Sequence, residues 1–220
     1  MKSLLLGIGA TLFFASNAHA ATLIYDEADP VNGDLSGDNL NPTLVNLSVG
    51  SNRISGSTTG NNNPVLDRDF FTFTIPVGRQ LSQVILTNYV GLDGTGANQG
   101  FLAVQRGSSI TSLNNNPPLL GAALIGAAPG TLQGDNVLDD VGTATPIQGN
   151  SFVGFPSGRL GAGTYTFWIQ ETAGGIQNYT LDFVVSTVPE PSTIFGISAV
   201  MGLGTLIKRK KRGQKATVNQ

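Results

Sequence analysis

Residues 69–76 read DFFTFTIP, a stretch in which large apolar side chains alternate with small polar ones. The stretch TYTFWIQ at 164–170 repeats this pattern. In an extended strand the apolar side chains of both stretches share one face: Phe71, Phe73, Ile75, Tyr165, Phe167 and Ile169. Alternation with a period of two therefore predicts strands that bury one face, and each such sheet needs a second sheet against its apolar side.

Further strands are predicted along the chain between residues 21 and 187. Apolar or alternating runs favour strands at 81–89, 101–106 and 179–185, with weaker ones at 22–25, 44–49, 52–57 and 151–155. Residues 107–150 are rich in Asn, Gly, Pro and Ala and contain no convincing helix, so we expect long loops with edge strands around 119–125. Short strands separated by turn residues are typical of one all-β domain, an antiparallel β-sandwich of the jelly-roll kind.

The N-terminus has the layout of a secretory signal peptide over residues 1–20. Lys2 precedes an apolar stretch of about ten residues, and Ala18-His19-Ala20 is the small-x-small pattern that signal peptidase accepts. Cleavage after Ala20 would make Ala21 the new N-terminus. The sequence thus predicts an exported protein whose first helix is removed.

The C-terminus carries an uncharged apolar run followed by a basic cluster. Residues 192–207 would form a helix of about 24 Å, which is short for a hydrocarbon core of roughly 30 Å. The basic cluster should stay in the cytoplasm and leave the domain outside. It comprises Lys208, Arg209, Lys210, Lys211 and Arg212. A permanent single-pass anchor and an amphipathic helix remain the alternatives to a processed transmembrane helix.

Residues 188–212 resemble the PEP-CTERM sorting signal of exported bacterial proteins. The likeness lies in Pro189-Glu190-Pro191, the glycine-containing apolar run and the basic end, after which a polar tail occupies 213–220. The resemblance implies that an exosortase-type transpeptidase cuts near the motif. The chain, anchored in the membrane before processing, would then reach the cell envelope or the extracellular matrix.

The segment from Gly33 to Phe183 also resembles bacterial pre-peptidase C-terminal (PPC) domains. The likeness rests on strand-and-turn patterns: GDLS at 33–36, GSNRISG at 50–56, DRDFF at 67–71, LGAGTYTF at 160–167 and YTLDF at 179–183. The resemblance implies a jelly-roll-like sandwich that serves as an accessory or binding module.

Composition argues against most catalytic chemistry in the exported domain. The chain has no cysteine, its only histidine is His19, and no lysine lies between residues 21 and 190. A serine or threonine nucleophile would therefore lack its usual base. Fourteen carboxylates against five arginines give these residues a net charge of about −9, which disfavours nucleic-acid binding. We expect a protein that is not an enzyme and carries no organic cofactor.

A few side chains remain as candidates for a site. Trp168 and Tyr165 could stack on a sugar ring, although single aromatic residues in strands more often pack in the core. Glu171 and Asp182 are the nearest candidates for a glycosidase pair; otherwise we expect an exposed strand end and an outward polar position for them.

The chain has no cysteine for a thiolate metal site, and calcium is the metal that we consider. Acidic turns could supply its carboxylate ligands: Asp67 with Asp69, Asp34 with Asp38, or Asp135 with Asp139 and Asp140. No twelve-residue EF-hand loop is present, so we favour solvated acidic turns over a calcium site. The sequence favours a structural or adhesive protein of the envelope or exopolysaccharide matrix. The alternatives are a polysaccharide- or peptide-binding module, with or without calcium, and a carboxylate-dependent hydrolase.

Overall fold

The computed structural model describes residues 20–60, 65–91, 99–111, 113, 118–143, 145–147, 151–155, 157–172 and 174–189. The expected signal helix, the apolar run at 192–207 and the basic cluster after it lie outside these residues. Within the part of the chain that is described, no helix is long and apolar enough to cross a membrane.

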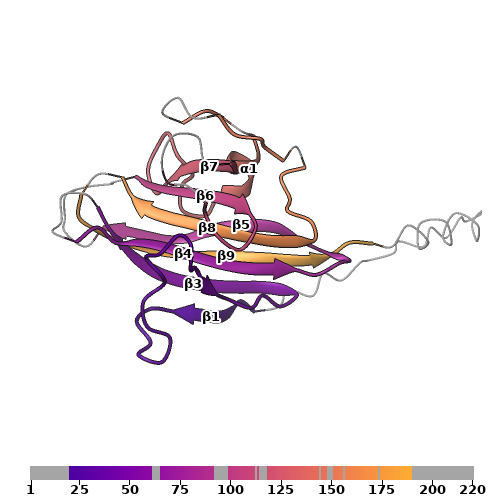
Figure 1. The fold of residues 1–220 in the computed structure, drawn as a ribbon, viewed down its shortest axis with the longest axis horizontal. Coiled ribbons are helices and arrows are strands. Elements are labelled where there is room, and N and C mark those ends of the chain that lie inside the picture. The colour runs from indigo at the N-terminus through magenta and orange to yellow at the C-terminus, as the bar shows by residue number, and fades with distance from the viewer. Residues whose placement is uncertain are drawn as a thin grey trace, which may run out of the picture.

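The described residues form two β-sheets and one short helix (Figure 1). The first sheet has the order β1 (Thr22–Asp26), β3 (Gly50–Thr59), β9 (Ile176–Thr187), β5 (Arg79–Gly91). The second has the order β2 (Thr43–Leu44), β4 (Arg68–Ile75), β8 (Gly163–Glu171), β6 (Gly100–Arg106), β7 (Leu119–Ile125). The helix is α1 (Val137–Gly142), which lies beside β7 at the upper edge of Figure 1.

The core lies between the two sheets and is built by the alternating residues. Phe183 of β9 meets three phenylalanine rings of the second sheet edge-on. The ring centroids are 5.7 Å away for Phe71, 5.7 Å for Phe73 and 5.2 Å for Phe167. All four side chains are buried, and burial of one such ring stabilises the fold by about 1.5–3 kcal/mol. The all-β, two-sheet prediction is confirmed.

The outer face of the second sheet is covered, although strands that alternate with a period of two usually leave this face in water. Phe70 and Trp168 lie on this face and stack with their ring centroids 5.8 Å apart. Ile110, Leu119 and Ala122 pack with them in a second apolar cluster. Ile110, Leu113 and Ile147 lie outside the named strands, belong to or pack against this cluster, and cover the face. Two large apolar rings at outward positions need such a cover.

Several details differ from the sequence prediction. β1 pairs with β3 and β2 with β4 in parallel, whereas every other strand pair is antiparallel. The strand expected at 44–49 shrinks to Thr43–Leu44, and 151–155 forms no strand. The helix α1 was not predicted, because six residues are too few to show a helical period. It forms because Asn136 caps its N-terminus and Val137 and Val141 are buried.

Candidate cation site

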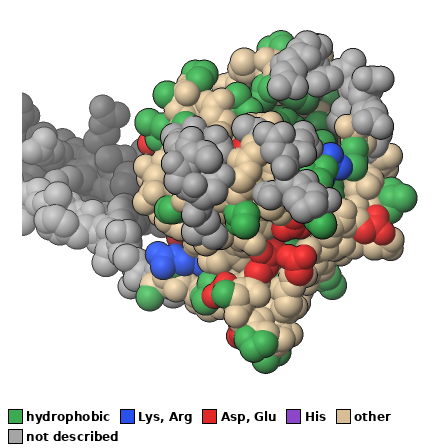
Figure 2. Space-filling view, turned by 90° about the vertical axis from the view of Figure 1, so that its left-hand side faces the viewer, with side chains coloured by type: hydrophobic (Ala, Val, Ile, Leu, Met, Phe, Trp, Pro, Cys, Tyr) green, Lys and Arg blue, Asp and Glu red, His purple; other side chains and the backbone are tan. Residues whose placement is uncertain are grey.

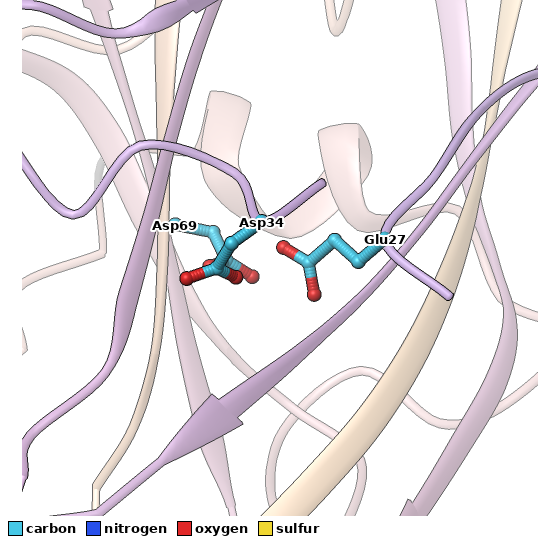
Figure 3. A group of neighbouring side chains, drawn as sticks. All are labelled: Glu27, Asp34 and Asp69. Carbon is cyan, nitrogen blue, oxygen red and sulfur yellow. The ribbon is translucent and has the colours of Figure 1, made fainter. Parts of the chain in front are cut away.

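Three carboxylates from separate elements converge at one place in the fold (Figure 3). Glu27 follows β1 directly, Asp34 lies in the loop after it, and Asp69 is the second residue of β4. One oxygen of each lies within 4.8 Å of the others. In Figure 3 Glu27 reaches toward the other two carboxylates from the opposite side. We call Glu27, Asp34 and Asp69 the acidic triad.

Asp69 is the buried member of the triad. Its side chain has no solvent exposure, and its Oδ2 accepts a hydrogen bond of 2.6 Å from the hydroxyl of Tyr179. Its Oδ1 is buried with no hydrogen-bond partner among the described residues. Leaving a buried carboxylate oxygen unpaired costs about 1–3 kcal/mol or more, so such an atom calls for a ligand.

Glu27 is held in place by two backbone N–H groups. Oε1 accepts a hydrogen bond of 2.9 Å from the amide of Leu35, and Oε2 accepts one of 2.6 Å from the amide of Ser57. The hydroxyl of Tyr25 donates to the carbonyls of Asn32 and Gly33, 3.1 and 3.2 Å away, and so supports the loop that carries Asp34. Oε2 also accepts a longer hydrogen bond of 3.4 Å from the hydroxyl of Ser57. Oε1 keeps a second lone pair, because a carboxylate oxygen can accept two hydrogen bonds or bind an ion.

The electrostatics of this site disfavour several negative charges without a counter-ion. Burial raises the pKa of Glu27 to about 7, although its backbone hydrogen bonds act in the opposite direction. Burial, and then the charge of Glu27, raise the pKa of Asp69 well above its usual range. Burial and the charge of Asp34 raise the pKa of the neighbouring Asp67 to about 6. A bound cation would remove this penalty by stabilising the ionised carboxylates.

The triad fits a calcium ion in both ligand type and spacing. All three ligands are carboxylate oxygens, which hard cations prefer. Two oxygens that bind one Ca²⁺ ion at about 2.3–2.6 Å can stand up to roughly 5 Å apart. The triad's limit of 4.8 Å is therefore compatible with one shared ion. Calcium takes about six to eight oxygens, so water or a further ligand would complete the shell.

A hollow of about 390 Å³ adjoins the triad on the first sheet. Glu27 and Asp34 line it, together with polar side chains of β3, β5 and β9. Figure 2 shows acidic side chains gathered near the centre of the face that it presents. Glu27 and Asp34 are thus reached from outside through a polar opening, whereas the buried Asp69 is not among the residues that line it.

The sequence placed the members of the triad in different groups. Asp69 was expected beside Asp67, and Asp34 beside Asp38; the fold instead joins Asp34 to Asp69 and adds Glu27. Asp38 is exposed and accepts hydrogen bonds from the side chain of Asn41 and the amide of Leu40. Hydrogen bonding to Asn41 and Leu40 lowers the pKa of Asp38.

The third acidic group lies near α1 and not at the triad. Asp139 and Asp140 belong to the first turn of α1, and Asp135 precedes the capping Asn136. The carboxylate of Asp140 accepts a short hydrogen bond from the hydroxyl of Thr131.

The two aromatic candidates are packed inside the protein. Trp168 is 6 % exposed and contacts Phe70 and Phe101, and Tyr165 is 1 % exposed. The hydroxyl of Tyr165 donates to the carbonyl of Gly161 and accepts from Arg106. Neither ring therefore offers an open face on which a sugar could stack.

Glu171 and Asp182 lie on different sheets. Glu171 ends β8 and is fully buried, not the exposed strand end that we expected; its Oε2 accepts a hydrogen bond of 3.0 Å from Tyr89. Asp182 has the predicted outward position on β9 and accepts from the hydroxyl of Ser51. The structure does not pair these carboxylates across a common cleft.

The described residues reach only the inner ends of the two terminal signals. Ala20 and Ala21 precede β1, and Pro189 is exposed shortly after β9, where the amide of Val188 donates a hydrogen bond of 2.8 Å to the carbonyl of Gly78. Ala18, Glu190, Pro191 and the cluster from Lys208 to Arg212 lie outside those residues.

No protein-family model, curated protein or solved structure matches this chain.

Proposed function

We propose that this chain is an exported, non-enzymatic β-sandwich protein of the jelly-roll kind that binds a calcium ion at the acidic triad. It serves as a structural or adhesive component of the cell envelope or exopolysaccharide matrix. The observation that supports a bound cation is the buried Oδ1 of Asp69, which has no hydrogen-bond partner among the described residues. The carboxylate of Asp69 converges with those of Glu27 and Asp34.

The position of the triad suggests why such a protein would need the ion. Asp69 belongs to the second sheet, whereas Glu27 and Asp34 belong to the N-terminal segment that joins the first sheet through β1. A shared cation would hold this segment against the core, in a chain that has no cysteine for a disulfide. Calcium sites of extracellular modules have dissociation constants of about 10⁻⁴–10⁻³ M, and we expect this range here.

The sorting part of the proposal rests on the sequence of the C-terminal tail. Signal peptidase would release the chain after Ala20, the apolar run would hold it in the membrane, and an exosortase-type enzyme would cut near Pro189. The mature C-terminus in envelope and medium fractions, measured by mass spectrometry, tests this part. A C-terminus at Gln220 in the membrane fraction would contradict it.

Thermal unfolding tests the cation. The full chain in detergent is freed of metal with a chelator and then melted with and without calcium. Calcium at ten times its dissociation constant should add roughly 1.4 kcal/mol, which corresponds to a Tm increase of about 3–6 °C for a chain of this size.

Two variants make this test specific. Asp69→Asn should abolish the calcium response, because it removes the buried ligand charge while the amide oxygen can still accept from Tyr179. Asp139→Asn changes a carboxylate on α1, away from the triad, and should keep the full response. An equal response in both variants would contradict the assignment to the triad.

A further inference from the structure

The hollow beside the triad lies on the outer face of the first sheet and is crossed by a row of polar residues. Asp26 pairs with Ser55, Ser55 with Thr180, and Thr180 with Asn88, so the row spans all four strands. Their side chains point away from the core, because the buried positions of β3 and β9 are the alternate ones. All four residues line the hollow, and we call them the polar row.

The polar row can both donate and accept hydrogen bonds. The hydroxyls of Ser55 and Thr180 lie 3.0 Å apart and bond to each other in either direction. Asn88 adds an amide, and Asn178 and Ser57, which also line the hollow, add another amide and hydroxyl. Hydroxyls and amides each carry donors and acceptors, as the hydroxyl groups of a sugar do.

The charge and polarity of the hollow select among possible partners. Among its described lining residues there is no Lys or Arg to attract an anion, and Asp26, Glu27 and Asp34 would repel one. Those residues also include no Leu, Ile, Val, Phe or Met, whereas the centre of a protein–protein interface is apolar. The surface therefore fits a neutral, hydroxyl-rich molecule better than an acidic polymer or a protein.

The geometry points to a role for the cation itself. Glu27 and Asp34 both line the hollow, so an ion that they share with Asp69 would lie beside it, within reach of a ligand in the hollow. We propose that the hollow binds a neutral polysaccharide, with hydroxyl groups of a sugar on the ion and neighbouring hydroxyls on the polar row. This inference rests on the proposed cation site.

The dimensions agree with such a ligand. A volume of about 390 Å³ lies in the lower part of the range of roughly 300–1,000 Å³ that small-ligand pockets occupy. It suits one or two sugar units and not a long stretch of polymer.

Retention on insoluble polysaccharides tests the inference. The full chain in detergent is applied to cellulose, to a β-1,3-glucan and to agarose, each with calcium or with a chelator. At least one of these neutral polymers should retain the protein in calcium, and the chelator should weaken the retention at least tenfold. Retention is also measured on alginate, which is anionic, and on gelatin, which is a protein, to test the two other classes of ligand.

A pair of matched variants locates the binding surface. Thr180→Val removes a hydroxyl of the polar row and should weaken retention about tenfold, while calorimetry shows unchanged calcium binding. Thr164→Val is the control, because the Thr164 hydroxyl pairs with that of Thr74, 2.9 Å away, on the second sheet. This control should be retained like the parent chain.

The possible outcomes separate this inference from the cation site. Calcium binding without retention on any neutral polymer overturns the polysaccharide and leaves the cation site standing. Retention only on alginate or gelatin, or an equal loss in both threonine variants, also overturns it. Failure of calcium to bind at all overturns both proposals.

Discussion

The hydroxyl of Tyr179 donates a 2.6 Å hydrogen bond to Oδ2 of Asp69, and this contact joins β9 of the first sheet to β4 of the second. Both side chains are buried, and burial raises the pKa of each well above its usual range. Phe71 and Phe73 fill the next inward positions of β4. The cation site thus adjoins the core at Asp69. Among the described residues, the side chain of Asp69 has one hydrogen-bond partner, the hydroxyl of Tyr179.

Tyr179→Phe removes this partner. In metal-free protein both oxygens of Asp69 would then lack the protein donor, so the free energy of unfolding should fall by about 1–3 kcal/mol. Urea denaturation measures the change. The double variant Asp69→Asn/Tyr179→Phe should lose less than the sum of the two single variants, because the two side chains interact directly. Strict additivity would contradict the coupling.

The pH dependence of stability should differ between metal-free and calcium-loaded protein. The pKa of Glu27 is about 7 in the folded state against an ordinary value of 4.5, so the folded state binds more protons between these values. The free energy of unfolding of metal-free protein should therefore fall as pH rises from about 4.5 to 7 and stay low above pH 7. We expect a fall of roughly 1–2 kcal/mol, because solvent screening of a half-buried group reduces the full effect.

Calcium should flatten or reverse this pH profile, because the ion binds the ionised carboxylates. Urea denaturation at pH 5, 6, 7 and 8, with calcium or a chelator, measures both profiles. A metal-free protein that becomes more stable from pH 5 to pH 7 would contradict the raised pKa of Glu27.

Gly56 leaves room for the Tyr179–Asp69 contact. A Cβ atom at this position would lie 2.5 Å from the hydroxyl oxygen of Tyr179 and 3.1 Å from Oδ2 of Asp69. Gly56→Ala should therefore displace the hydroxyl, lower the stability by about 1–3 kcal/mol and weaken calcium binding. Gly161→Ala is the control, since a Cβ there meets no atom within 4 Å. Equal effects of the two substitutions on thermal unfolding would be evidence against this role.

The end of β9 constrains where the tail can be cut. Thr187 pairs with Arg79, and the amide of Val188 bonds to the carbonyl of Gly78, so the folded domain extends to the residue before Pro189. A processing enzyme needs an extended, accessible segment, and we therefore expect the mature C-terminus at or after Pro189. Mass spectrometry of the C-terminal peptide measures it. A terminus inside β9 would mean that the strand detaches before cleavage.

The strands of the core could be predicted from the sequence because their side chains alternate. β4 and β8 follow the phenylalanine pattern closely, and the edge strand near 119–125 was predicted within its observed bounds. The cover on the second sheet could not be predicted in the same way. Phe70 and Trp168 signal an apolar outer face, but only the three-dimensional path of the chain after β6 shows what covers it.

The acidic triad could not be predicted from the sequence, for a related reason. Glu27 and Asp34 are close in the sequence, but Asp69 is far from both and meets them only through the pairing of strands, in which β1 runs parallel to β3. The spacing of residues along the sequence does not show which strands pair. No sequence motif marks Glu27 either. Its carboxylate is held by the backbone amides of Leu35 and Ser57, and a backbone amide does not depend on the side chain of its residue.

Isothermal titration of calcium into the metal-free full chain tests the central claim most directly. We predict one ion per chain with a dissociation constant of about 10⁻⁴–10⁻³ M, the same binding in Asp139→Asn, and none in Asp69→Asn. The absence of binding heat in the parent chain at millimolar calcium, or undiminished binding in Asp69→Asn, would contradict a cation site at Glu27, Asp34 and Asp69.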